Sequence, residues 1–320
     1  MALTEVFMVL GFLLAAYSII ANDAIQTLGT FLASNSHRPW WVLWIFAGAV
    51  LATVVIYGWV SNGGDPAYGR LENFPVPATG ITWMHAVPPL VILFLTRWGI
   101  PVSTTFLVLA IFNPGNVGDM LIKSGAGYLV AFVVAIVVYR FVISKTTEYF
   151  DRTINDPVPL YWVALQWFAT AFLWSQWLIQ DLANIFVYLP RQIGLGELLL
   201  SVAFMVALLG IVFYQYGGAI QQIVTSKTGT QDIRAATIID FIYAIILFVF
   251  KEWSNVPMST TWVFLGLLAG RQLAISIHMY MPALNESANL VIQDLRKAGI
   301  GLAVSLALAF GLPAFYGILQ

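Results

Sequence analysis

Long apolar stretches dominate the chain and exclude most soluble architectures. A helix that crosses a bilayer needs about 20 mostly apolar residues. Ten segments approach this pattern, at residues 5–33, 40–60, 81–98, 100–113, 120–143, 159–190, 195–215, 234–250, 256–270 and 298–318. Since 60% of the 320 residues are hydrophobic and only 9% are charged, a soluble fold lacks the polar surface to cover them. The sequence therefore predicts an all-α polytopic membrane protein with about ten membrane segments.

Charge and cysteine content exclude several other classes of protein. The net charge is −1 and no basic run follows the chain, so nucleic acid is excluded as a partner. The absence of cysteine excludes disulfides, thiol catalysis and cysteine-based metal sites. No His/Glu spacing is typical of a metal centre and no glycine-rich loop is typical of a nucleotide site. We therefore expect no cofactor, and the lipid bilayer as one partner.

An internal duplication divides the chain into two halves. The stretch Pro101-Val102-Ser103-Thr104-Thr105 recurs as Pro257-Met258-Ser259-Thr260-Thr261, and Asn22-Asp23-Ala24-Ile25-Gln26 is matched by Gln180-Asp181-Leu182-Ala183-Asn184. Asp23 precedes Pro101 by 78 residues and Asp181 precedes Pro257 by 76. Each half holds five apolar segments, an odd number, so the second copy enters the membrane the other way up. This predicts two inverted-topology repeats, residues 1–150 and 151–320, with a binding site near the midplane.

Each half carries an aspartate inside an apolar segment, where a carboxylate is costly. On translocon scales an Asp at mid-membrane costs about 2.5–3.5 kcal/mol unless it is protonated or meets a cation. Residues i and i+3 share a helix face, so Asp23 pairs with Gln26 and Asp181 with Asn184. Carboxylate and amide oxygens suit a hard cation. We expect a cation site, for Na⁺ or alternatively for protons, at Asn22, Asp23, Gln26, Gln180, Asp181 and Asn184.

The duplicated Ser-Thr-Thr clusters suit a different ligand. A proline favours the first turn of a helix, where free backbone N–H groups carry partial positive charge. Hydroxyl groups add further donors, and helix starts of this kind bind anions. We expect an oxyanion site formed by Ser103, Thr104, Thr105, Ser259, Thr260 and Thr261. The segments at 100–113 and 256–270 are short, so broken or re-entrant helices are expected at these motifs and at the two aspartates.

These motifs resemble a known family. Ala21-Asn22-Asp23 followed by Gly29-Thr30, together with the paired Pro-x-Ser-Thr-Thr motifs, resembles the PiT family of inorganic phosphate transporters, which includes sulfate permeases. The resemblance implies an inverted repeat, cation-coupled anion uptake and external termini. By position, it assigns cation binding to Asn22, Asp23, Asp181 and Asn184, and it assigns the anion to the Ser-Thr-Thr residues.

Several positions depart from the family pattern. The second Asn of the first half is Gln26, and the first Asn of the second half is Gln180. The His that follows Ser-Thr-Thr in the family is Phe106 in one half and Trp262 in the other. A glycine is missing after the second Asp motif, where Tyr188-Leu189-Pro190-Arg191 stands. These changes indicate retained machinery with an altered pocket, so phosphate is the expected substrate and sulfate or another small anion is the alternative.

The distribution of Lys and Arg predicts the orientation. With ten crossings, one face carries Arg38, Arg97, Arg140, Lys145, Arg152, Lys227, Arg234, Arg271, Arg296 and Lys297, and the other carries Arg70, Lys123, Arg191 and Lys251. The richer face is expected in the cytoplasm. Both termini then lie outside, in a plasma or inner membrane. The polar stretch 271–297 is expected to lie on the membrane surface as an amphipathic helix.

Three other ionisable groups have open roles. Arg191 lies about 15 Å along a helix from Asp181, which favours an interfacial charge over an anion ligand. Asp240 precedes Pro257 by 17 residues, and the matching position of the first half is Met84, beside His85. A proton or ion relay and a helix-packing role are both compatible with this pattern. His37 and His278 fall in polar connections and are expected at the surface.

Three functions compete for these features. The first is a secondary transporter that works by alternating access. The second is an intramembrane serine hydrolase that uses Ser103 or Ser259 with His85, and the symmetric duplication of the serine without the histidine argues against it. The third is a passive channel, which does not explain the paired buried aspartates. The sequence favours a non-enzymatic transporter and leaves the oligomeric state open, with a homodimer as one option.

Overall fold

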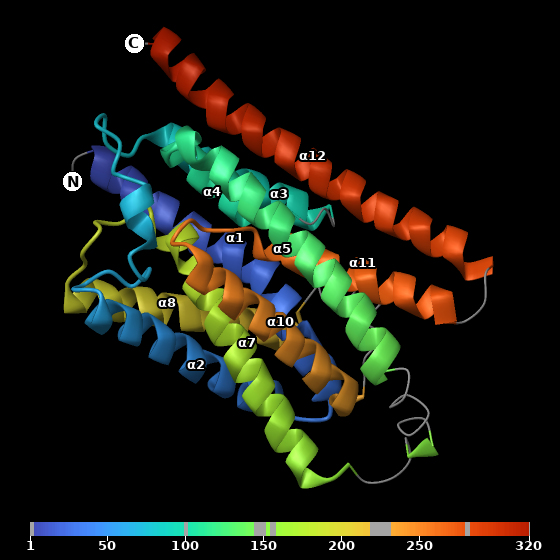
Figure 1. Cartoon of the computed structure of the whole chain (residues 1–320). Helices are drawn as coiled ribbons and strands as arrows, with labels where there is room; N and C mark the ends of the chain where they lie inside the picture. The colour runs from blue at the N-terminus through green and yellow to red at the C-terminus, as the bar shows by residue number, and fades with distance from the viewer. Residues whose placement is uncertain are drawn as a thin grey trace.

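All regular structure in the described part of the chain is helical. The computed structural model describes residues 3–98, 102–143, 152–153, 158–217, 232–278 and 282–319, so Pro101, Lys145 and Lys227 lie outside the described residues. The elements are α1 (Leu3–Ser34), α2 (Trp40–Ser61), η1 (Arg70–Asn73), α3 (Trp83–Arg97), α4 (Thr104–Phe112), η2 (Pro114–Asn116), α5 (Val117–Val138), η3 (Tyr139–Ile143), α7 (Leu160–Phe186), α8 (Leu195–Tyr214), α10 (Ile233–Trp253), α11 (Thr260–His278) and α12 (Pro282–Leu319) (Figure 1). The predicted all-α class is confirmed.

Within the described residues, six helical stretches are long and apolar enough to cross a membrane. They are Leu3–Ala24, Trp40–Ser61, Pro114–Phe141, Leu195–Tyr214, Ile233–Trp253 and Val291–Ile318. α7 has 27 residues, yet its glutamines, tryptophans and Asp181 lower its mean hydropathy below that of the six. α3 and α4, with 15 and 9 residues, are too short for a full crossing. The ten crossings and the inverted repeats stay predictions.

Two pairs of helices pack closely, α5 with α11 and α7 with α10. Among the described elements, α5 packs most extensively on α11, and α7 packs most extensively on α10. Gly266 and Gly270 of α11 face the main-chain oxygens of Tyr128 and Phe132 so closely that a Cβ atom at either glycine would clash. Small residues that let helix backbones approach in this way are typical of membrane helix interfaces.

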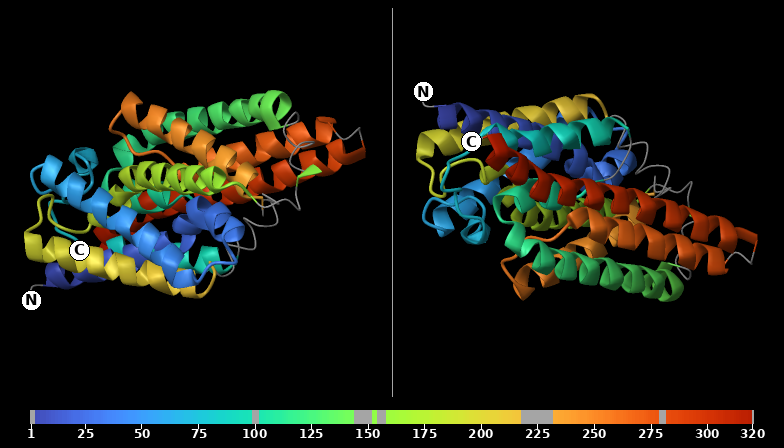
Figure 2. Two further views of the ribbon diagram at one scale, coloured as in Figure 1. Left: turned by 90° about the horizontal axis from the view of Figure 1, so that it is seen from below. Right: turned by 90° about the horizontal axis from the view of Figure 1, so that it is seen from above.

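The two termini lie at the same end of the helical bundle. Figures 1 and 2 show α1 beginning and α12 ending at this end in every view. The connection between α2 and α3, which includes η1, lies at this end too. We refer to it below as the terminal end of the bundle.

Two expectations about helix breaks are wrong. α1 and α7 continue without interruption through Asp23 and Asp181, whereas breaks were expected there. The physical reason is that hydroxyl and amide side chains donate to both carboxylates, at both oxygens of Asp23 and at Oδ1 of Asp181, so neither backbone has to open. At the Ser-Thr-Thr motifs, in contrast, new helices do begin, at Thr104 and Thr260.

The stretch 271–297 does not form a separate surface helix. Residues 271–278 extend α11, and residues 282–297 form the first part of α12, a single helix of 38 residues. An uninterrupted helix satisfies its backbone hydrogen bonds across the polar-to-apolar boundary of this stretch, which explains the continuity.

Candidate functional site

The two duplicated aspartates meet in the interior, surrounded by the two Ser-Thr-Thr motifs. Asp23 on α1 is 1% exposed and Asp181 on α7 is 0% exposed. α4 and α11, which begin at the motifs, each contact both α1 and α7. The structure thus brings together four segments that are far apart in the sequence. We call residues 102–105 the first tip and residues 258–261 the second tip.

Both carboxylate oxygens of Asp23 accept hydrogen bonds. Its Oδ2 accepts from the Thr104 hydroxyl at 2.6 Å, and its Oδ1 accepts from Asn22 Nδ2 at 2.5 Å and from Gln26 Nε2 at 3.2 Å. Asn22 also donates to the main-chain oxygen of Val102 at 3.4 Å. The first aspartate is therefore tied directly to the first tip.

Asp181 is only half satisfied. Its Oδ1 accepts from Asn184 Nδ2 at 2.7 Å and from the Thr105 hydroxyl at 3.1 Å. Asn184 Nδ2 is also within 3.2 Å of both the Thr104 and Thr105 hydroxyl oxygens. In the part of the chain that the structure describes, Asp181 Oδ2 and Asn184 Oδ1 are buried and have no hydrogen bond of normal geometry. The Thr260 hydroxyl of the second tip approaches the Asp181 carboxylate without completing such a bond. Two unpartnered oxygens on one helix face leave acceptor capacity for a ligand that brings positive charge.

The expected i, i+3 pairs hold for Gln26 and Asn184, whereas Gln180 turns away. Gln180 Nε2 donates to the main-chain oxygen of Leu247 on α10 at 3.3 Å. This contact places its amide on the α10 side of α7. Consecutive helix residues are rotated by about 100°, so the side chains of Gln180 and Asp181 point in different directions. The structure does not bring Gln180 to the other expected cation-site residues.

Serine caps both tip helices in the same way. The Ser103 hydroxyl accepts from the Phe106 amide at 3.3 Å, and the Ser259 hydroxyl accepts from the Trp262 amide at 3.2 Å. A serine at this position satisfies one of the free N–H groups at a helix start. The matching bonds show that the duplicated motif folds alike in the two halves.

The two tips exchange equivalent hydrogen bonds. The Thr105 hydroxyl lies 3.2 Å from the main-chain oxygen of Met258, and the Thr261 hydroxyl lies 3.2 Å from that of Val102. Thr105 and Thr261 are matching positions of the duplicated motif, as are Val102 and Met258. The rings of Phe106 and Trp262, also matching positions, lie with centroids 5.7 Å apart. The histidines of the family pattern are thus replaced by one aromatic pair between the tips.

Three residues near the site escaped sequence reasoning. Arg70 of η1, and Lys123 and Ser124 of α5, are buried against the residues around the second tip. Their partners are mostly main-chain atoms more than 100 residues away, which leave no motif in the sequence. The one available signal was the position of Lys123 inside an apolar segment.

Asp240 forms a second polar cluster, away from the tips. Its Oδ1 accepts from the Thr30 hydroxyl of α1 at 2.5 Å, and its Oδ2 accepts from the Thr170 hydroxyl of α7 at 2.8 Å. These bonds join α10 to both aspartate helices. Just beyond the end of α1 and at the start of α10, Arg38, Asp232 and Arg234 line a cavity of about 490 Å³. A packing role and a relay role for Asp240 both stay predictions.

Arg191 and His85 lie apart from the tips. Arg191 donates to the main-chain oxygens of Phe74, Val187 and Leu189, in the connections at the terminal end. His85 accepts at Nδ1 from the Thr82 amide at 3.1 Å, and its ring lies 4.9 Å from that of Phe112. These contacts hold both side chains in place, although the buried His85 Nε2 and Arg191 Nε have no hydrogen-bond partner among the described residues.

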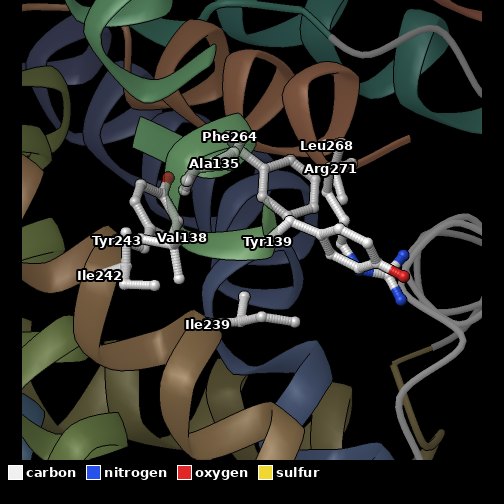
Figure 3. A pocket seen from close by; sticks show the side chains of 10 residues that line it. Ala135, Val138, Tyr139, Ile239, Ile242, Tyr243, Phe264, Leu268 and Arg271 are labelled. Carbon is white, nitrogen blue, oxygen red and sulfur yellow. The ribbon is translucent and has the colours of Figure 1, made fainter. Parts of the chain in front are cut away.

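A small cavity borders the second tip on one side. It measures about 40 Å³ between α5, α10 and α11, with mostly apolar lining that includes Ile242, Phe264 and Leu268 (Figure 3). Tyr243 stands in its wall and donates to the main-chain oxygen of Thr260 at 3.0 Å. At about 10–15 Å³ per water, it has room for a few waters. An apolar lining does not suit an anion, so we do not assign the site to this cavity.

Comparison with known proteins places the fold. No family model and no curated protein matches the chain. Among solved structures, a sodium-dependent phosphate transporter superposes with a TM-score of 0.54 at 17% sequence identity, over 98% of this chain and 100% of its own. The likeness shows that the chain has the fold of that transporter. With six apolar helices, the chain is an integral membrane protein.

Proposed function

We propose that the protein is a secondary active transporter for an inorganic oxyanion, phosphate first, coupled to Na⁺ or H⁺ by alternating access. The observation that carries the proposal is the pair of unpartnered acceptor oxygens, Asp181 Oδ2 and Asn184 Oδ1, beside two helix starts that carry hydroxyls. Oxygens of this kind suit a cation, and helix starts suit an anion. The fold that the chain shares with a sodium-dependent phosphate transporter supports the same conclusion.

The hydroxyl bonds suggest how the two ligands are coupled. The Thr104 hydroxyl donates to Asp23, and the single proton of the Thr105 hydroxyl is shared between Asp181 and the main-chain oxygen of Met258, so both protons are engaged in this arrangement. A cation that binds the carboxylates replaces these hydroxyls as their partner. The hydroxyls then turn and donate to an anion, and the cation offsets the negative charge of that anion. Cation binding therefore prepares the anion site.

The geometry argues against a serine hydrolase. Both motif serines use their hydroxyl oxygens as helix caps, and the His85 ring contacts Thr82 and Phe112. A nucleophile needs a base within hydrogen-bond reach. Among the described residues, neither serine has such a contact with His85. Sulfate or another small anion remains the alternative substrate, since helix starts and hydroxyls recognise tetrahedral oxyanions in general.

Uptake into proteoliposomes tests the function. Radiolabelled phosphate and sulfate are offered under an imposed Na⁺ gradient and, separately, a proton gradient. We expect gradient-driven phosphate uptake that falls by at least about tenfold in Asp23→Asn and in Asp181→Asn, because each change removes a charge that holds the cation. Asp119→Asn is the matched control, since Asp119 is exposed at the start of α5. Normal coupled uptake in both site variants would contradict the proposal.

A further inference from the structure

Two positively charged side chains are buried beside the second tip without an acidic partner. Arg70 is 2% exposed and Lys123 is 4% exposed. In the described ranges, salt bridges join Arg234 to Asp232 and Lys251 to Glu252, and none involves these two cations. A buried charge without a counter-charge is strongly unfavourable, so something nearby has to offset both.

Main-chain oxygens satisfy the hydrogen bonds of both cations. Lys123 Nζ donates to Ser254 at 2.8 Å and to Val256 at 2.7 Å, and Arg70 Nη1 reaches Asn255 at 3.4 Å. These three consecutive carbonyls lead directly into the second tip. Carbonyl oxygens complete the hydrogen bonding, but they carry no formal charge.

The same cations are connected to the aspartate site. Arg70 Nε donates at 2.8 Å to the main-chain oxygen of Ile179, which precedes Asp181 by two residues on α7. Next to Lys123, the Ser124 hydroxyl accepts from the Ser259 amide at 2.8 Å. The carboxylates whose charges act on Arg70 are those of Asp181 and Glu252, and Glu252 is paired with Lys251 at 2.9 Å. Asp181 is thus the unpaired negative charge that Arg70 faces.

When all four buried side chains are ionised, their charges sum to zero. Asp23 and Asp181 contribute two negative charges, and Arg70 and Lys123 contribute two positive ones. We propose that Arg70 and Lys123 are fixed counter-charges of the site, which strengthen the binding of the anion and weaken the binding of the coupling cation. The inference rests on the proposed transport function and makes the two residues determinants of affinity rather than ligands.

Opposite changes in the two affinities separate this role from a structural one. Lys123→Gln and Arg70→Gln each remove one positive charge. We expect each variant to bind Na⁺ more tightly in the absence of anion, and to need more phosphate for half-saturation at saturating Na⁺. Each shift is expected on the order of tenfold, the size that Coulomb's law gives for unit charges about 10 Å apart at an effective dielectric constant near 20.

The experiment uses the full-length purified protein. Na⁺ binding is followed by intrinsic tryptophan fluorescence without anion, and phosphate half-saturation is followed by uptake into proteoliposomes. Lys123→Arg keeps the charge and is expected to restore both affinities to within about twofold of wild type, well inside the shift expected for loss of the charge. Lys297→Gln makes the same charge change at an exposed position of α12 and is expected to change neither affinity.

Each result decides a different question. Na⁺ and phosphate affinities that weaken together, or that do not change, overturn the counter-charge role, as does a Lys123→Arg variant that behaves like Lys123→Gln. A wild-type protein that binds Na⁺ and phosphate but shows no gradient-driven uptake overturns the transport function, while the fluorescence and equilibrium phosphate titrations still test the charges. A wild-type protein that binds neither ion overturns both proposals.

Discussion

At the scale of single residues, the site depends on hydroxyl groups shared between carboxylates and helix starts. Thr104 connects Asp23 with Asn184, and Thr105 connects Asp181 with the second tip. A hydroxyl in the interior is favourable only while its hydrogen bonds are kept. These two threonines are therefore sensitive to changes that preserve their shape but remove the oxygen.

Replacing Thr104 with valine keeps the shape of the side chain and removes its hydroxyl. In the proposed coupling, the Thr104 hydroxyl leaves Asp23, to which it donates at 2.6 Å, and donates to the anion instead. Without this donor we expect phosphate half-saturation to rise by about fivefold to a hundredfold, equivalent to about 1–3 kcal/mol for a lost buried hydrogen bond. Thr104→Ser should restore most of the affinity. Thr53→Val, on the exposed face of α2, is the control. Equal uptake in Thr104→Val and Thr53→Val would show that the hydroxyl has no part in binding.

At the scale of elements, two features hold the helices in place around the site. The α5–α11 interface brings backbones into direct contact at Gly266 and Gly270. The connection between α2 and α3 is fixed in part by the half-buried Tyr68, whose hydroxyl donates to the main-chain oxygen of Val54 at 2.6 Å. Both features act on the second tip, because α11 begins there and η1 of the connection carries Arg70.

Gly270→Ala is expected to destabilise the α5–α11 interface. The added Cβ would clash with the main-chain oxygen of Phe132, and a backbone atom cannot move aside as a side chain can. Overpacking of this kind costs about 1–3 kcal/mol. Thermal unfolding in detergent measures the loss. Gly299→Ala on α12 is the matched control, since its Cβ would meet open space, and an equal effect of both substitutions would rule out the interface as the cause.

Tyr68 is expected to make the stability of the α2–α3 connection fall at alkaline pH. Burial, with a smaller contribution from Tyr57, raises the pKa of Tyr68 from 10.0 to about 12. The folded state therefore favours the protonated phenol, so its contribution to stability is complete below pH 10 and is lost as the pH rises through 12. We expect the wild type to lose stability relative to Tyr68→Phe over this window. Melting temperatures of the wild type and of Tyr68→Phe that change equally from pH 9 to 12 would contradict this role of Tyr68.

At the scale of the whole molecule, the placement of the termini constrains the topology. Both termini lie at the terminal end, whereas Arg38 and Arg234 line a cavity at the other ends of α1 and α10. A chain whose termini share an end crosses an even number of times. The ten predicted crossings meet this condition, and the side of the membrane on which the termini lie stays a prediction.

The absence of native cysteine makes this orientation easy to test. Glu5→Cys, in the first turn of α1, and Glu72→Cys, in η1, place single thiols at exposed positions of the terminal end, and Arg152→Cys places one on the predicted cytoplasmic side. We expect a membrane-impermeant maleimide to label the first two in intact cells, and the third only after permeabilisation. Labelling of Arg152→Cys alone in intact cells would reverse the orientation.

The sequence was informative where side chains repeat and uninformative where main-chain atoms act. The spacing of Asp23, Asp181 and the two Ser-Thr-Thr motifs predicted segments that the structure brings together. Arg70 and Lys123 could not be found in this way, because carbonyl oxygens hold them and every residue supplies one. The prediction of breaks in α1 and α7 was wrong because side chains donate hydrogen bonds to both aspartates, so the helices stay continuous. These donors come from distant segments, so they cannot be identified before the fold is known.

The exchange of bonds between the two tips has a consequence for sequence divergence. In each exchange the donor is a threonine side chain, whereas the acceptor is a peptide carbonyl, contributed by Val102 in one half and Met258 in the other. Selection on this contact therefore acts on the threonine and not on the side chain of its partner. Substitutions can accumulate at the acceptor positions without altering the contact, so a chain can diverge far in sequence and still assemble the same centre.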